Sequence, residues 1–353
     1  MKTKFLFFTL GLIILVFLLS GCSGGMTPSS WAGVTSDEET AYIAMATHIY
    51  AVQVSNGVER WRFPEKPDAK KTFFAAPTLT DDGQLIAGCY DHILYSLSPS
   101  NGSINWTFEG SKDHWIGSAI TGNDMIFAPS ADYNLYALNM KGELVWKFTA
   151  GQALWGQPVV DGTNVYFGSM DHKVYALNME TGNMVWSSEL DGSILGAISL
   201  GPDGILYAGT LGDSVFALET ASGKTKWRQS LSSRIWSAPV VGDGNLYVGD
   251  QAGKIFSLAL DSGKENWSIQ PDGPVLGSPL VLTDLVIIGT ESGSLLALDA
   301  NGKTVWSKTI TGKLYSTPVL AGDFILVAPV EGDSTLIAFD QNGTQQWVYT
   351  PAK

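Results

Sequence analysis

Eight tryptophans recur at nearly constant spacing along this chain, and a glycine stands four positions before each of them. The tryptophans are Trp61, Trp106, Trp146, Trp186, Trp227, Trp267, Trp306 and Trp347, and the glycines are Gly57, Gly102, Gly142, Gly182, Gly223, Gly263, Gly302 and Gly343. The intervals between tryptophans are 39 to 45 residues. Such a period is typical of repeat architectures, in which each unit buries its apolar face against its neighbours. The chain is therefore limited to a closed ring or an open solenoid.

Each unit contains four short apolar stretches separated by turn signals. In the fourth unit these stretches are Pro158-Val-Val, Val165-Tyr-Phe-Gly, Val174-Tyr-Ala-Leu and Met184-Val-Trp. Asp161-Gly162, Asp171-His172 and Thr181-Gly182 lie between them and indicate turns. The glycine before each tryptophan suits a hairpin turn with positive φ. No helical period of useful length is present, so we expect four antiparallel strands in every unit.

A large apolar residue opens every unit, and small residues follow it. These residues are Trp31, Phe74, Ile116, Trp155, Leu195, Trp236, Leu276 and Tyr315. They could form a stacking platform for a ligand, but strands in a propeller are packed on both faces, which favours a place in the core. Because the repeat begins at Trp31, we expect every unit to be built from one continuous stretch of chain.

The choice between ring and solenoid depends on the ends of the repeat. An open solenoid needs polar capping units to cover its last apolar faces, and the eight near-equal units include no such cap. Four-stranded units of about 40 residues are typical of propeller blades. We therefore predict an all-β fold, an eight-bladed β-propeller of four-stranded antiparallel blades, over residues 31–353.

Segments such as Val174-Tyr-Ala-Leu-Asn-Met-Glu-Thr-Gly-Asn-Met-Val-Trp resemble the pyrroloquinoline quinone (PQQ) repeat family, over roughly residues 31–350. The resemblance implies that each repeat tryptophan docks between neighbouring blades. The acidic residue usual after the third strand is present only as Glu219, Asp299 and Asp340. Its counterparts elsewhere are Gln53, Ser98, Asn139, Asn178 and Ala259. WD40 repeats fit less well, because the sequence has no Trp-Asp dipeptide.

The first residues have the pattern of a secretory signal. Lys2 and Lys4 precede an apolar run that is shorter than the ~20 residues a bilayer span needs. Leu19-Ser20-Gly21-Cys22 resembles the lipobox of bacterial lipoproteins, which implies cleavage before Cys22 and lipid on its thiol. We expect a signal peptide over 1–21 and a lipidated tether over 22–30. An uncleaved signal anchor is the alternative.

The net charge indicates which partners the protein can bind, and the cysteine content indicates whether it forms a disulfide. The net charge is −13, and it becomes −15 without the two signal lysines, because residues 1–21 contain no acid. An acidic surface repels phosphate backbones, so we expect no nucleic-acid partner. With lipid on Cys22, the second cysteine, Cys89, has no intramolecular partner. We expect it to be a buried, inert thiol.

The PQQ resemblance also raises an enzymatic alternative, a PQQ-dependent dehydrogenase or a small-ligand-binding propeller. Active members of that family have an adjacent cysteine pair and acid-bearing loop insertions, and this chain has neither. Phosphate-loop, zinc-protease and serine-hydrolase motifs are also missing from the sequence. We therefore predict a non-enzymatic protein with no catalytic, cofactor or metal site and no cofactor.

A lipid-anchored propeller of this length and repeat type is similar to the BamB-like propeller lipoproteins of the outer-membrane β-barrel assembly machinery. The resemblance implies a scaffold that binds protein partners of the cell envelope through loops on one face. The protein would be anchored to the outer membrane in a diderm cell, or to the outer leaflet of the cell membrane otherwise.

One face of the predicted ring carries variable loops. Antiparallel blades place the second-to-third turns and the blade links on the same face, and all four histidines fall there. Candidate partner-binding residues are His92, His114, Trp115, Tyr133 and His172, because aromatic residues are favoured at binding hot spots. The alternative is that Asp-His and Asp-Tyr simply suit exposed turns. His92 and His172 are two blades apart, which argues against a shared zinc ion.

Overall fold

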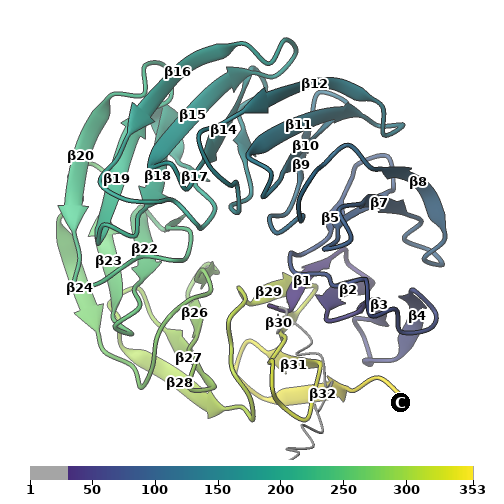
Figure 1. The fold of residues 1–353 in the computed structure, drawn as a ribbon. Coiled ribbons are helices and arrows are strands. Elements are labelled where there is room, and N and C mark those ends of the chain that lie inside the picture. The colour runs from purple at the N-terminus through teal and green to yellow at the C-terminus, as the bar shows by residue number, and fades with distance from the viewer. Residues whose placement is uncertain (1–30, 353) are drawn as a thin grey trace, which may run out of the picture.

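A computed structural model describes residues 31–352, which form eight four-stranded antiparallel sheets arranged as a ring (Figure 1). Each sheet consists of four strands consecutive in sequence, so no strand is shared between blades. The prediction of an all-β, eight-bladed propeller is confirmed. The expected signal peptide, the lipid site Cys22 and the tether lie outside the described residues.

The strands run from the axis outward within each blade. Blades 1 to 4 contain β1 (Gly33–Ser36), β2 (Thr40–Met45), β3 (His48–Gln53), β4 (Glu59–Phe63), β5 (Thr78–Leu79), β6 (Leu85–Gly88), β7 (Leu94–Leu97), β8 (Ile104–Phe108), β9 (Ile120–Gly122), β10 (Met125–Pro129), β11 (Asn134–Asn139), β12 (Leu144–Thr149), β13 (Val159–Val160), β14 (Asn164–Gly168), β15 (Lys173–Asn178) and β16 (Met184–Glu189). Blades 5 to 8 contain β17 (Ser199–Leu200), β18 (Ile205–Gly209), β19 (Ser214–Glu219), β20 (Thr225–Ser230), β21 (Val240–Gly242), β22 (Asn245–Gly249), β23 (Ile255–Ala259), β24 (Glu265–Ile269), β25 (Leu280–Val281), β26 (Val286–Gly289), β27 (Ser294–Leu298), β28 (Thr304–Thr309), β29 (Val319–Ala321), β30 (Phe324–Val327), β31 (Leu336–Asp340) and β32 (Gln345–Tyr349).

Helical structure is nearly missing from residues 31–352. It is limited to one 3₁₀ turn, η1 (Pro202–Gly204), between β17 and β18. No helix in this part of the chain has the length and apolar character needed to cross a bilayer.

Each repeat tryptophan joins its blade to the next one. Its indole Nε1 donates a hydrogen bond of 2.7–3.1 Å to a backbone oxygen in the third-to-fourth turn of the following blade. The ring lies on the glycine of that turn. Gly142, for example, has φ of 80°, and a Cβ there would lie 2.4 Å from Trp106. Glycine is therefore required both by the backbone conformation and by the close approach of the indole.

The same contact closes the ring. Trp347 of blade 8 donates to the carbonyl of Val54 in blade 1 at 2.8 Å and packs on Gly57. Tyr349 hydrogen bonds to Glu59 beside it. Within residues 31–352, the apolar core divides into eight clusters, one at each boundary between neighbouring blades. The docking inferred from the PQQ resemblance is present at every boundary, including the seam.

Candidate functional site

The second-to-third turns and the blade links lie on one face of the ring, which we call the link face. Its turns are at 46–47, 89–93, 130–133, 169–172, 210–213, 250–254, 290–293 and 328–335, and its links are at 64–77, 109–119, 150–158, 190–198, 231–239, 270–279 and 310–318. Backbone hydrogen bonds fix links to turns, as between the Ala131 amide and the His114 carbonyl at 3.0 Å. The link face is therefore a set of loops that are held to one another by backbone hydrogen bonds.

Four of the five candidate partner-binding residues are accessible on this face. His92, Tyr133 and His172 occupy equivalent positions of three consecutive turns, each with a left-handed φ of 70° to 76°. Tyr133 and His172 are exposed, whereas His92 and His114 are half-buried. A left-handed backbone is unfavourable for residues other than glycine. Side chains kept at these positions are therefore candidates for a role outside folding.

The prediction that Trp115, the fifth candidate, contacts a partner is wrong. Its side chain is 0% exposed, so it cannot contact a partner. It packs at the boundary of blades 2 and 3, 5.4 Å from the Tyr136 ring, and its Nε1 donates to the His92 carbonyl at 3.0 Å. Trp115 therefore fixes the turn that presents His92. His48 is also buried, at the first position of β3.

Asp–Tyr pairs stiffen the turns of blades 2 to 4. In each turn an aspartate accepts a 2.6 Å hydrogen bond from the tyrosine four residues later; the pairs are Asp91–Tyr95, Asp132–Tyr136 and Asp171–Tyr175. Burial and the facing carboxylate raise the pKa of all three tyrosines. The tyrosines therefore remain protonated donors at neutral pH.

Blade 2 adds a lysine to this arrangement. Lys71 Nζ lies 2.9 Å from Asp91 and also hydrogen bonds to Tyr95. Burial alone would raise the pKa of Asp91, but the hydrogen bonds from Tyr95 and Lys71 outweigh it and lower the pKa. The neighbouring Cys89 is buried, which raises its thiol pKa to about 12. It matches the expected inert thiol.

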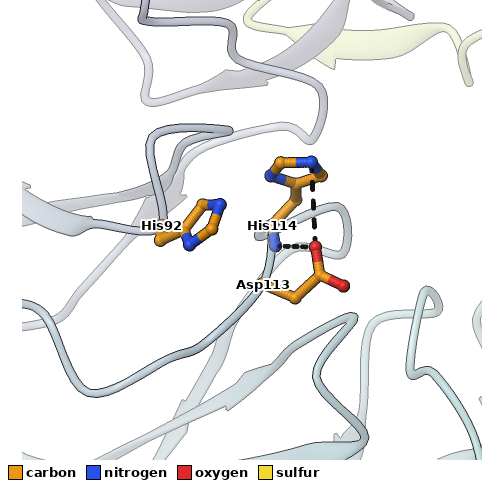
Figure 2. Close-up of side chains that lie close together, drawn as sticks. All are labelled: His92, Asp113 and His114. Carbon is orange, nitrogen blue, oxygen red and sulfur yellow. Dashed lines mark hydrogen bonds and ion pairs between the residues drawn. The ribbon is translucent and has the colours of Figure 1, made fainter.

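His92, Asp113 and His114 form a cluster on the link face (Figure 2). Each offers one ligand atom, and these atoms lie within 4.8 Å of one another. His114 Nε2 is 3.7 Å from Asp113 Oδ1, and the two imidazole centroids are 4.9 Å apart. The sequence analysis considered a metal ion shared by His92 and His172. The fold instead brings His92 next to His114, 22 positions later.

Stacked rings connect this cluster to the axis. The His114 ring lies 3.9 Å from Tyr90 and nearly parallel to it, and Tyr90 stacks on Phe74 at 4.4 Å. Phe74 lines a cavity of about 390 Å³ on the propeller axis. The link between blades 1 and 2 and the turn of blade 2 therefore form one continuous packed unit.

The axial cavity corrects a second expectation. The large residues that open the blades all line it: Trp31, Phe74, Ile116, Trp155, Leu195, Trp236, Leu276 and Tyr315. From blade 2 on, the residue before each of them belongs to the core, including Phe73, Leu154 and Ile235. The Trp31 ring lies 5.2 Å from that of Trp236 and 5.8 Å from that of Tyr315. From blade 2 on, two large residues stand side by side at each blade start, and this pair was the available signal.

A family model described as outer membrane protein assembly factor BamB (PQQ_2) matches residues 91–200, 131–230, 170–301 and 279–352. Among curated proteins, the outer membrane protein assembly factor BamB of Moranella endobia is 24% identical over 249 residues, 64% of this chain and 61% of that protein. The tetrathionate hydrolase of Acidithiobacillus ferrooxidans is 23% identical over 263 residues, 60% of this chain and 52% of that enzyme. The chain thus matches only about half to six-tenths of the length of these relatives.

Solved structures share the fold. The crystal structure of BamB from Moraxella catarrhalis superimposes with a TM-score of 0.72, covering 86% of this chain and 92% of that one. Its sequence identity to this chain is 17%. At this identity the likeness concerns the arrangement of the blades.

Proposed function

This chain belongs to the PQQ-repeat family described as outer membrane protein assembly factor BamB, and on that premise we propose that it is a lipid-anchored, non-enzymatic scaffold that binds protein partners in the cell envelope. The printed names of its relatives support a role in outer-membrane protein assembly. Cys22 would hold the lipid, and residues 22–30 would tether the propeller to the membrane.

The observation that carries this proposal is the row of side chains on the link face of blades 2 to 4. His92, Tyr133 and His172 project from left-handed turn positions that glycine would fill at lower cost. The Asp–Tyr pairs hold these turns rigid, which lowers the entropy lost on binding. Rigid turns that present rings to solvent suit protein recognition.

The test is recovery of envelope partners with the full-length lipidated protein. Replacing His92, His114, Tyr133 and His172 together by alanine should reduce co-purified partner at least about tenfold, as loss of a hot spot does. A matched control replaces Lys141, Glu180 and Lys224, which are exposed in third-to-fourth turns on the opposite face. Unchanged recovery with the first set, together with loss in the control, would place the site on the opposite face.

The anchor has a separate test. Cys22→Ser should release the protein from membranes and abolish incorporation of labelled palmitate, because stable anchoring needs two acyl signals. If the variant is still found in the membrane fraction and still incorporates labelled palmitate, lipidation at Cys22 is contradicted.

The enzymatic alternative is tested with the same preparation. One relative is named tetrathionate hydrolase, so the assays include tetrathionate hydrolysis beside PQQ-dependent dye reduction with calcium. We expect neither activity above a no-protein control. Turnover in either assay would contradict the scaffold proposal and favour the enzymatic alternative.

A further inference from the structure

The His92–Asp113–His114 cluster brings together three metal-ligating groups from two segments of the link face. His92 comes from the β6–β7 turn, and Asp113 and His114 come from the link between β8 and β9 (Figure 2). In a tetrahedral zinc site, bonds of ~2.0–2.1 Å place neighbouring ligand atoms roughly 3.3 Å apart. The 3.7 Å between His114 Nε2 and Asp113 Oδ1 is close to that spacing. The ligand atoms of all three residues lie within 4.8 Å of one another, so binding one ion requires them to move closer together.

The His114 ring is already set for metal binding through Nε2. Its Nδ1 lies 2.8 Å from the backbone oxygen of Tyr90. Because a carbonyl oxygen only accepts, Nδ1 carries the proton, and Nε2 of the neutral ring has the free lone pair. Stacking on Tyr90 fixes the plane of the ring. A histidine ligand that donates its other N–H to a backbone carbonyl is the usual arrangement in metalloproteins.

The other two ligands are also supported. Trp115 Nε1 donates to the His92 carbonyl, and the His92 amide donates to the Cys89 carbonyl at 3.3 Å. The hydroxyl of Ser111 donates to the Asp113 carbonyl at 2.8 Å and accepts from the Asp113 amide at 3.2 Å. The backbone on both sides of the cluster is therefore fixed before any ion binds, which reduces the cost of ordering the ligands.

The donor set selects a class of ion. Two imidazole nitrogens and one carboxylate suit Zn²⁺ and neighbouring late first-row divalent ions, whereas Mg²⁺ and Ca²⁺ prefer shells of oxygen alone. The Asp113 and His114 side chains are 49% and 36% exposed, so solvent can reach a fourth coordination position.

We propose that His92, Asp113 and His114 bind one divalent transition metal ion of the Zn²⁺ type, with water as the fourth ligand. The ion ties the turn of blade 2 to the link that leads into blade 3. This inference does not depend on the proposed function, because the three ligands lie within one chain.

The experiment uses the full-length protein in detergent, without a polyhistidine tag and stripped with EDTA. Calorimetric titration with ZnCl₂ should give one ion per chain, and Co²⁺ should give the intense visible absorption of a tetrahedral site. His114→Ala and Asp113→Asn should each weaken Zn²⁺ binding by more than about tenfold.

Two variants make the test decisive. His92→Gly should fold, because glycine occupies the equivalent position at Gly253 and Gly293, and it should lose the Co²⁺ spectrum. His172→Ala is the matched control, because His172 occupies the equivalent turn of blade 4 and belongs to no such cluster in residues 31–352. It should bind Zn²⁺ as the parent does. Failure of the parent to bind Zn²⁺ at 100 μM, or equal loss in His172→Ala, would overturn the proposal.

Discussion

Blades 2 to 4 and blades 6 and 7 build the same turn from different residues. The turns of blades 6 and 7 place Gly253 and Gly293 at the left-handed position, with φ of 84° and 85°. The turns of blades 2 to 4 hold the same backbone conformation with His92, Tyr133 and His172. The shape of the turn is therefore independent of the side chain. What differs is whether a ring projects from the link face, and our proposal assigns partner binding to the turns that have one.

The polar support of these turns differs as well. In blades 2 to 4 the carboxylate comes from the turn and accepts from a tyrosine of the third strand. In blade 7 the carboxylate comes from the link: Asp272 accepts from Thr290 at 3.1 Å and from Ser294 at 2.7 Å. The turns with projecting rings thus have an internal brace, whereas the glycine turn of blade 7 depends on its neighbouring link.

The largest expected difference in stability is between removal of a carboxylate that belongs to the turn, Asp91, and removal of one that belongs to the link, Asp272. Asp91→Ala removes the carboxylate that faces the mostly buried Lys71 ammonium and leaves the Tyr95 hydroxyl proton without its acceptor, so we expect a loss of about 3 kcal/mol in the free energy of unfolding. Asp272→Ala, at an exposed residue, should cost less than about 1 kcal/mol. Urea unfolding of both variants measures this. Equal losses would show that the two braces are equivalent.

The next largest loss of stability is expected when the histidine of the blade 2 turn is placed at the equivalent position of blade 6. Gly253→His introduces a left-handed non-glycine residue, and its Cβ would lie 2.4 Å from the Gly273 carbonyl oxygen. We expect a loss of at least about 2 kcal/mol, measured by the same unfolding assay. A variant as stable as the parent would mean that the links of blades 6 and 7 leave room for side chains.

The reverse replacement should have a small effect of opposite sign. His172→Gly relieves the left-handed strain but increases the entropy of the unfolded chain, so stability should change by less than about 1 kcal/mol, in the stabilising direction. Partner recovery should fall at the same time. A marked loss of stability would show that His172 serves folding.

The smallest expected effect concerns the buried histidine of blade 1. Burial and then the Arg62 charge lower the pKa of His48, so the folded state disfavours the protonated ring. Below the ordinary histidine value of about 6.5 the unfolded chain binds a proton that the folded chain does not. Stability should therefore decline modestly between pH 7.5 and 5.5. His48→Gln should flatten that slope, and an unchanged slope would assign it to other groups.

Sequence reasoning reached the fold because its strongest signals are local and periodic. The glycine and tryptophan of each unit describe one hairpin and one docking contact, and both recur in every blade. The axial lining was assigned to the core because two large residues stand side by side in the link before the first strand of blades 2 to 8, and spacing alone does not show which of the two faces the axis. Trp115 was placed on the surface because it is an aromatic residue of a link, whereas it is the member of its pair that packs between blades.

The histidine cluster could not be derived from spacing alone. His92 and His114 belong to different loops, and they meet because the link leaving blade 2 lies over that blade's own turn. This packing depends on the buried Trp115, whose orientation the sequence did not reveal. A rule that pairs each turn with the link following its own blade would have found the cluster.

The docking of Trp347 on blade 1 sets an order of events during synthesis. The two partners of this hydrogen bond are 293 residues apart. At about 5–20 residues per second, the tryptophan emerges roughly 15–60 s after its acceptor. Throughout that interval Ile43 and Val52 of blade 1 lack their packing partners Leu326 and Leu336, which have not yet been made. The first blade made is thus the last one completed, because its packing partners come from the final blade.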